Sequence, residues 1–164
     1  MTNEEFEHLI DQLKNKFYRF AFSILKNEED AKDTVQEVVL RLWNRRSELD
    51  KTKNTESFCM NAIKHQALDE LRKQNRKIKF INDADSKQFH EDKTENYDLL
   101  EKLQKELKNL TVQQRMAVEL KDFQGYEYEE ISEMLNLSVN AIRAHVSRGR
   151  KRLYEIFKDE IDER

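Results

Sequence analysis

The densest group of side chains able to do chemistry lies near the C-terminal end of the chain. Residues 139–153 contain no acidic residue, and they hold five cations: Arg143, Arg148, Arg150, Lys151 and Arg152. Arginine can hydrogen-bond both acceptor atoms of a guanine edge, and arginine and lysine both neutralise phosphates. The chemistry that this stretch indicates is recognition of nucleic acid.

Two predicted helices position these cations. Tyr128–Leu135 fits a short helix, Asn136 can adopt the left-handed conformation of a tight C-cap, and Ser138 is a good N-cap for a second helix. In that second helix Gly149 permits a close approach, and the apolar stripe comprises Ile142, Val146 and Leu153. The opposite stripe holds Asn140, Arg143, Ala144, Ser147 and Arg148. We therefore predict a DNA-binding helix-turn-helix at Tyr128–Leu153, with His145 either packed or contacting phosphate.

The remainder of the chain is predicted to be helical. Apolar residues recur at helical spacing over residues 6–24, 31–42, 58–76 and 99–110, and Thr111 with Gln114 forms a capping box for a further helix. The chain has no proline and only two glycines, and it lacks the alternation typical of strands. We predict an all-α protein of two small helical domains, residues 1–78 and 98–164. A polar, acidic linker joins them at 79–97, because residues 82–96 have little apolar surface to bury, although a short surface loop with some helix also fits this segment.

Composition excludes several classes of protein. The single cysteine rules out an internal disulfide framework, and four scattered histidines offer no metal-binding spacing. No cofactor or metal is expected. No nucleophile–base pair or phosphate-binding loop indicates an enzyme. No apolar run is long enough for a membrane span, and the N-terminus lacks a leader pattern, so we expect no membrane insertion and a cytoplasmic location.

Three blocks of sequence, taken together, resemble a known family. Residues 125–153, GYEYEEISEMLNLSVNAIRAHVSRGRKRL, resemble region four of sigma factors, the proteins that give RNA polymerase its promoter specificity. Asp30–Trp43 looks like the polymerase-binding helix of region two, and Ser57–Lys73 looks like the helix that reads and melts the promoter. The two-domain size resembles the extracytoplasmic-function (ECF) sigma factors, and the resemblance covers Leu9–Phe157.

The resemblance implies a role for each block. The recognition helix would bind the −35 element through Asn140, Arg143, Ala144, Ser147 and Arg148. The third helix and the preceding loop, Lys51–Ser57, would face the −10 element, through Phe58, Asn61, Lys64, His65, Arg72, Lys73 and Arg76. Phe58 stands where the family often has tryptophan and His65 where it often has asparagine. Phe58 either stacks on bases or packs in the core, and Asp69 orients its neighbours.

The resemblance also implies partners. The second helix would bind the clamp helices of the polymerase β′ subunit through Asp33, Gln36, Glu37, Leu40, Arg41 and Trp43, although Leu40 and Trp43 fit ordinary packing as well. The family also contacts the β flap and is commonly inhibited by an anti-sigma factor. The linker would act as a nucleic-acid mimic in a basic channel or as a solvated tether. With a net charge of −3, the chain should bind promoter DNA weakly unless core polymerase holds it.

Two other functions fit parts of the pattern. A stand-alone helix-turn-helix regulator would need a sensing or dimerisation domain in residues 1–76, where no receiver-like alternation of strands and helices occurs. A helical adaptor or inhibitor without a DNA role would not need the arginine cluster of the recognition helix.

Overall fold

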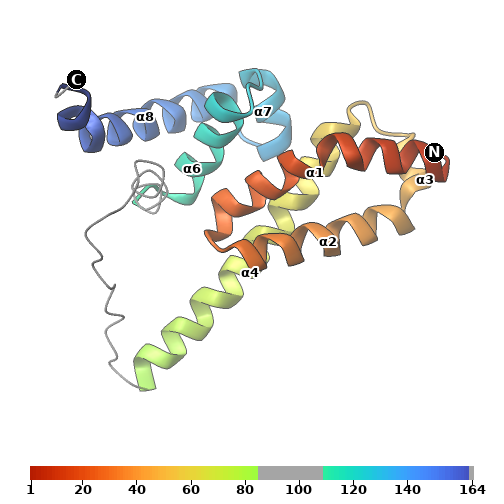
Figure 1. Cartoon of the computed structure of the whole chain (residues 1–164), viewed down its shortest axis with the longest axis horizontal. Helices are drawn as coiled ribbons and strands as arrows, with labels where there is room; N and C mark the ends of the chain where they lie inside the picture. The colour runs from red at the N-terminus through yellow and green to blue at the C-terminus, as the bar shows by residue number, and fades with distance from the viewer. Residues whose placement is uncertain (85–108, 163–164) are drawn as a thin grey trace.

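The computed structural model describes residues 1–84 and 109–162, and every element in these ranges is helical, which confirms the all-α prediction (Figure 1). The N-terminal half contains α1 (Asn3–Leu25), α2 (Glu28–Asn44), α3 (Arg46–Leu49) and α4 (Thr55–Ala84). The C-terminal half contains α6 (Val112–Val118), the π-helix η1 (Glu119–Phe123), α7 (Tyr128–Leu135) and α8 (Val139–Asp162). No described helix combines the length and the apolar character that crossing a membrane requires.

Local capping explains where the N-terminal helices begin. Thr2 and Glu5 form a capping box at the start of α1, and the Asn27 side chain accepts from the Asp30 backbone N–H at 3.0 Å at the start of α2. Lys26, with φ +57°, turns the chain between these helices. The short helix α3 was not predicted. Helix α4 continues to Ala84, beyond the predicted end near Arg76, so residues 79–84 of the predicted linker are helical.

The C-terminal half follows its predicted signals closely. Thr111 and Gln114 make the expected capping box of α6, and Asn136 ends α7 in the left-handed conformation with φ +53°. The Ser138 hydroxyl accepts from the Ala141 N–H at 3.1 Å and caps α8. The rest of the predicted linker, 85–97, and most of the leucine repeat predicted at 99–110 lie outside the described residues.

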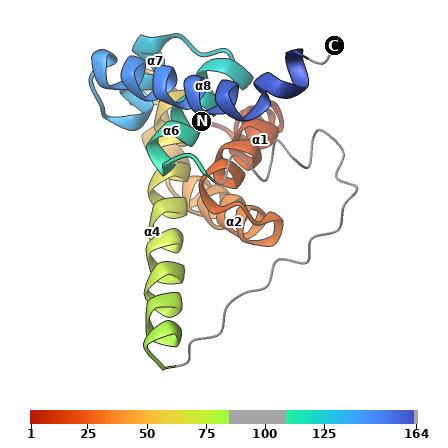
Figure 2. The same cartoon turned by 90° about the vertical axis from the view of Figure 1, so that its left-hand side faces the viewer.

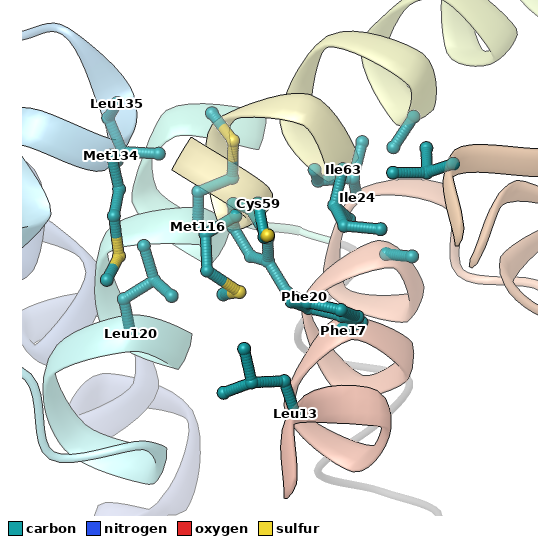
Figure 3. Packing of buried hydrophobic residues seen from close by; sticks show 14 of the residues in the cluster. Leu13, Phe17, Phe20, Ile24, Cys59, Ile63, Met116, Leu120, Met134 and Leu135 are labelled. Carbon is teal, nitrogen blue, oxygen red and sulfur yellow. The ribbon is translucent and has the colours of Figure 1, made fainter. Parts of the chain in front are cut away.

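The two halves pack against each other through one continuous apolar core. Phe17 and Phe20 of α1 and Met60 of α4 belong to the same cluster as Met116 of α6 and Met134 of α7, as the close view in Figure 3 illustrates for several of these side chains. Two domains were predicted, and both are recognisable. Their close packing was not predicted, and it brings α7 onto the N-terminal part of α4 while the second half of α4 projects beyond the bundle (Figure 2).

Gly149 confirms the close approach expected of it. A Cβ atom at this position would lie 2.7 Å from Cγ2 of Val118, so α6 and α8 touch where a larger residue would collide. The contact fixes the recognition helix against α6.

Replacing Gly149 with alanine should destabilise the protein. The collision with Val118 costs about 1–3 kcal/mol, and alanine's better helix propensity offsets about 1 kcal/mol of it, so the expected net loss is up to about 2 kcal/mol. Urea denaturation measures the difference. In a Val118→Ala background, which removes the colliding methyl, the same substitution should be neutral or stabilising; an equal loss in both backgrounds would contradict the collision.

Candidate nucleic-acid interface

The predicted recognition face of α8 is open to solvent. Asn140, Arg143, Ser147 and Arg148 are exposed and Ala144 is half-buried, whereas Ile142, Val146 and Gly149 are buried on the other side of the helix. The N-terminal part of α8 therefore presents polar and cationic groups on one face and packs with the other. This arrangement suits insertion into a major groove. His145 is half-buried, between its two predicted placements.

Tyr128, at the start of α7, contacts two cations of this half through its ring. The Arg143 guanidinium lies 5.2 Å and the Lys121 ammonium 4.6 Å from the centroid of the Tyr128 ring. Such cation–π contacts restrict where a long side chain points. Sequence reasoning used Tyr128 only to mark the start of a helix and did not identify this role.

Arg150 is held in place by η1. Its Nε donates to Asp122 at 2.9 Å and its Nη2 donates to the other carboxylate oxygen, a bidentate pair that raises the pKa of the Arg150 guanidinium. In the sequence, Arg150 stands only as one of the five cations of residues 139–153. The structure gives it a structural role, because it ties α8 to η1.

The predicted −10 residues on α4 divide into two groups. Phe58 is 40% exposed, so it does not pack in the core and its ring is available for stacking. His65, Arg72, Lys73 and Arg76 are also exposed. Arg72 donates to Asp69 at 2.8 Å, in keeping with the orienting role expected of Asp69.

The second group, Asn61 and Lys64, is covered by the C-terminal half. Asn61 Nδ2 donates to the Met134 carbonyl at 2.9 Å, and Lys64 Nζ donates to the Leu135 carbonyl at 3.1 Å. Lys64 is only 7% exposed, and its burial lowers the pKa of the ammonium group. The structure therefore does not bring all seven predicted −10 residues to one open surface.

The predicted polymerase-binding residues form an open face on α2. Asp33, Gln36, Glu37 and Arg41 are exposed, and Leu40 is 62% exposed. The Arg41 guanidinium donates to Gln66 of α4 at 2.9 Å, and Gln66 donates to Glu37 at 3.1 Å, so this face is braced from α4. Trp43 differs, because its ring packs edge-on against Phe6 at 5.4 Å and is partly buried. Of the two readings of Trp43, packing fits better.

Sequence reasoning missed Arg115, the most buried cation of the junction between the halves. It is 4% exposed and donates to the carbonyl oxygens of Ser23 at 2.7 Å, Ile24 at 3.2 Å and Leu110 at 2.7 Å. Burial lowers its pKa to about 10. The available signal was an arginine followed directly by the apolar run Met116–Ala117–Val118.

Two family models match the chain in order. "Sigma-70 region 2" matches residues 9–77 and "Sigma-70, region 4" matches residues 100–153, so together they cover most of the chain. The chain belongs to the sigma-70 family, whose members are RNA polymerase sigma factors. The match at region two decides against a stand-alone helix-turn-helix regulator and against an adaptor without a DNA role.

Curated relatives place the chain within that family. The RNA polymerase sigma factor SigV of Bacillus subtilis is 28% identical over 138 residues, which is 84% of this chain and 82% of the relative. The ECF RNA polymerase sigma factor SigX of the same organism is 24% identical over 170 residues, covering 96% and 88%. This protein is an ECF sigma factor, which binds core RNA polymerase and promoter DNA in transcription initiation.

Solved structures share the whole fold. The sigma factor RpoE of Bartonella quintana, in complex with the anti-sigma factor NepR, has a TM-score of 0.78 at 23% identity, covering 94% of this chain and 98% of that one. CnrH, in complex with the cytosolic domain of CnrY, has a TM-score of 0.70 at 18% identity, covering 96% and 90%.

Removing the Tyr128 ring should weaken DNA binding by the helix-turn-helix. Tyr128→Ala frees Arg143 and Lys121, and a loss of about 1 kcal/mol corresponds to roughly fivefold weaker binding. Tyr128→Phe, which keeps the ring, should retain most of the affinity. Titration of duplex promoter DNA with the polymerase-bound protein measures the effect. Tyr154→Ala is the matched control, since Tyr154 is a 60% exposed tyrosine of α8 outside the recognition face; equal losses from both alanine variants would contradict the role of Tyr128.

Proposed function

We propose that the two halves of this sigma factor read the two promoter elements. The recognition helix α8 binds the −35 element through Asn140, Arg143, Ala144, Ser147 and Arg148. The promoter-facing side of α4 binds the −10 element through Phe58, Asn61, Lys64, His65, Arg72, Lys73 and Arg76. The functional boundaries follow from this division: residues 1–78 form the first unit, 98–164 the second, and 79–97 connect them.

The observation that carries the −35 assignment is the two-sided character of α8. One face is buried against α6, and the other presents Arg143 and Arg148 to solvent with Arg143 braced by Tyr128. Arginine reads guanine bidentately in the major groove, and a braced arginine loses less entropy on binding. The −10 assignment is supported by an exposed aromatic residue, Phe58, on the same helix as a cationic stretch. Stacking platforms beside a basic path are typical of single-strand binding.

Core polymerase engages both units in this proposal. The exposed face of α2, with Asp33, Gln36, Glu37, Leu40 and Arg41, docks on the β′ clamp helices, and Trp43 supports it from within. The second unit contacts the β flap. Polymerase acts in the cytoplasm, so we place the protein there. No reaction is assigned to the chain, because its family works by positioning polymerase on DNA.

An anti-sigma factor is the proposed regulator. The two solved structures described above are both complexes with a partner protein, the anti-sigma factor NepR in one and the cytosolic domain of CnrY in the other. In this proposal the partner holds the two units in a closed arrangement, and binding to polymerase spreads them apart.

Alanine at both Arg143 and Arg148 should reduce promoter-specific transcription at least about tenfold, because each bidentate base contact contributes about 1–3 kcal/mol. In vitro transcription with core enzyme, on promoters selected from a random library, measures the loss. The matched control is Lys151→Ala with Arg152→Ala, which removes the same charge from the same helix. Equal activity of the two double variants would show that α8 supplies only general positive charge.

Leu40→Ala should weaken binding to core polymerase without changing the fold. A 62% exposed leucine contributes little to the protein's own stability, whereas truncating an apolar anchor at an interface costs about 1–2 kcal/mol. Competition for core enzyme against the wild-type protein should show roughly tenfold weaker binding. Ile78→Ala is the control, since Ile78 is 50% exposed but lies on α4. Unchanged competition by Leu40→Ala would remove α2 from the polymerase interface.

A further inference from the structure

The C-terminal end of α7 accepts hydrogen bonds from two of the side chains assigned to the −10 element. Asn61 Nδ2 donates to the Met134 carbonyl at 2.9 Å, and Lys64 Nζ donates to the Leu135 carbonyl at 3.1 Å. Met134 and Leu135 are the last two residues of α7 before the Asn136 cap. The last carbonyls of a helix have no intrahelical donor and carry the negative end of the helix dipole. They therefore offer an amide and an ammonium group the same chemistry as the acceptor atoms of bases and phosphates.

We propose that α7 is an intramolecular competitor of the −10 DNA strand, so that the free chain masks part of its own −10 surface without a partner protein. This inference rests on the proposed function of Asn61 and Lys64. Lys64 is 7% exposed in the closed arrangement and its ammonium group is bonded to the end of α7, so DNA reaches it only when α7 leaves.

The mask is partial, and it affects one promoter element only. On α4, the other five residues assigned to the −10 element stay exposed: Phe58, His65, Arg72, Lys73 and Arg76. The mask therefore covers Asn61 and Lys64 and leaves the rest of the assigned surface open. On α8, Arg143 and Arg148 are exposed, and the −35 face is not masked. Closure therefore lowers affinity for the −10 strand and leaves the recognition helix available.

Contacts around the masked residues hold α7 and the neighbouring segments of the C-terminal half against the N-terminal half of the chain. Arg115 donates to the carbonyls of Ser23 and Ile24 near the end of α1, and Gln124 Nε2 donates to the Lys16 carbonyl at 3.1 Å. Arg19 of α1 lies 3.5 Å from Glu119 of η1. The Tyr126 hydroxyl donates to Glu56 of α4. Arg19 and Gln124 are the positions best suited to substitution, because neither belongs to a proposed DNA or polymerase surface.

The test weakens the junction between the two halves by substituting these two residues. Arg19→Glu places a carboxylate opposite Glu119, and Gln124→Ala removes a neutral hydrogen bond without changing the charge. Lys14→Glu is the matched control: it makes the same charge change on the same helix at similar side-chain exposure, 56% against 53%, and Lys14 pairs only with Asp11 of its own helix among the described residues. Circular dichroism checks that each variant keeps its helical content.

Two measurements are made on the full chain. The first is the rate at which a thiol reagent modifies Cys59, the single cysteine, which is fully buried in the same apolar cluster as Phe20 and Met116 (Figure 3). The second is the affinity for a fluorescent, random-sequence single-stranded DNA. We expect the combined Arg19→Glu and Gln124→Ala variant to react faster and to bind the single strand several-fold more tightly than Lys14→Glu. Adding Asn61→Ala and Lys64→Ala should abolish that gain.

Each outcome distinguishes the inference from the function on which it rests. Unchanged Cys59 reactivity in the combined variant, or faster reactivity without tighter single-strand binding, overturns the inference. Loss of promoter opening by polymerase carrying Asn61→Ala and Lys64→Ala would then still support the proposed −10 function. Normal promoter opening by that double variant would instead remove these residues from the −10 site and the inference with them.

Discussion

The junction between the two halves depends on two buried cations that bind backbone carbonyls at helix ends. Arg115 of the second half reaches the end of α1, and Lys64 of the first half reaches the end of α7. Burying an unpaired charge is costly, and among the described residues neither cation pairs with a carboxylate. The carbonyl dipoles offset part of that cost. Such a contact stabilises one relative placement of the halves, because a small displacement leaves both cations buried without acceptors.

This placement of the two halves leaves two functional surfaces open and covers part of a third. The α2 face and the recognition face of α8 lie open, whereas Asn61 and Lys64 of the α4 face are bonded to the end of α7. A ligand shifts a conformational equilibrium only by the difference in its affinity for the two states. Polymerase and the −10 strand favour the open arrangement to the extent that they bind surfaces, or hydrogen-bonding side chains, that the closed arrangement covers. The −35 duplex, read by a face that is open in the described arrangement, gains little from opening.

The sequence predicted the local features of the fold because local features have local causes. The caps at Thr111, Asn136 and Ser138 depend on residues within a few positions, and all three occur where they were predicted. The recognition face of α8 follows from helical spacing in the same way. The shared core and the junction were not predicted. Lys64 and Leu135 are 71 positions apart, and a polar residue on a helix looks the same in sequence whether it faces solvent, DNA or another helix.

Local charge and the junction together explain how a chain of net charge −3 can act on DNA. Phosphate neutralisation supplies much of the affinity of DNA-binding proteins, and a chain of net negative charge gains little affinity from it. Closure removes Lys64 from the cations available to DNA and leaves those of α8 and the second half of α4. The apparent affinity of a masked site falls by the fraction of molecules that are open. The free protein therefore binds the −10 strand weakly for two reasons, its net negative charge and its closed arrangement. A partner that favours the open arrangement raises that affinity without adding a contact to DNA.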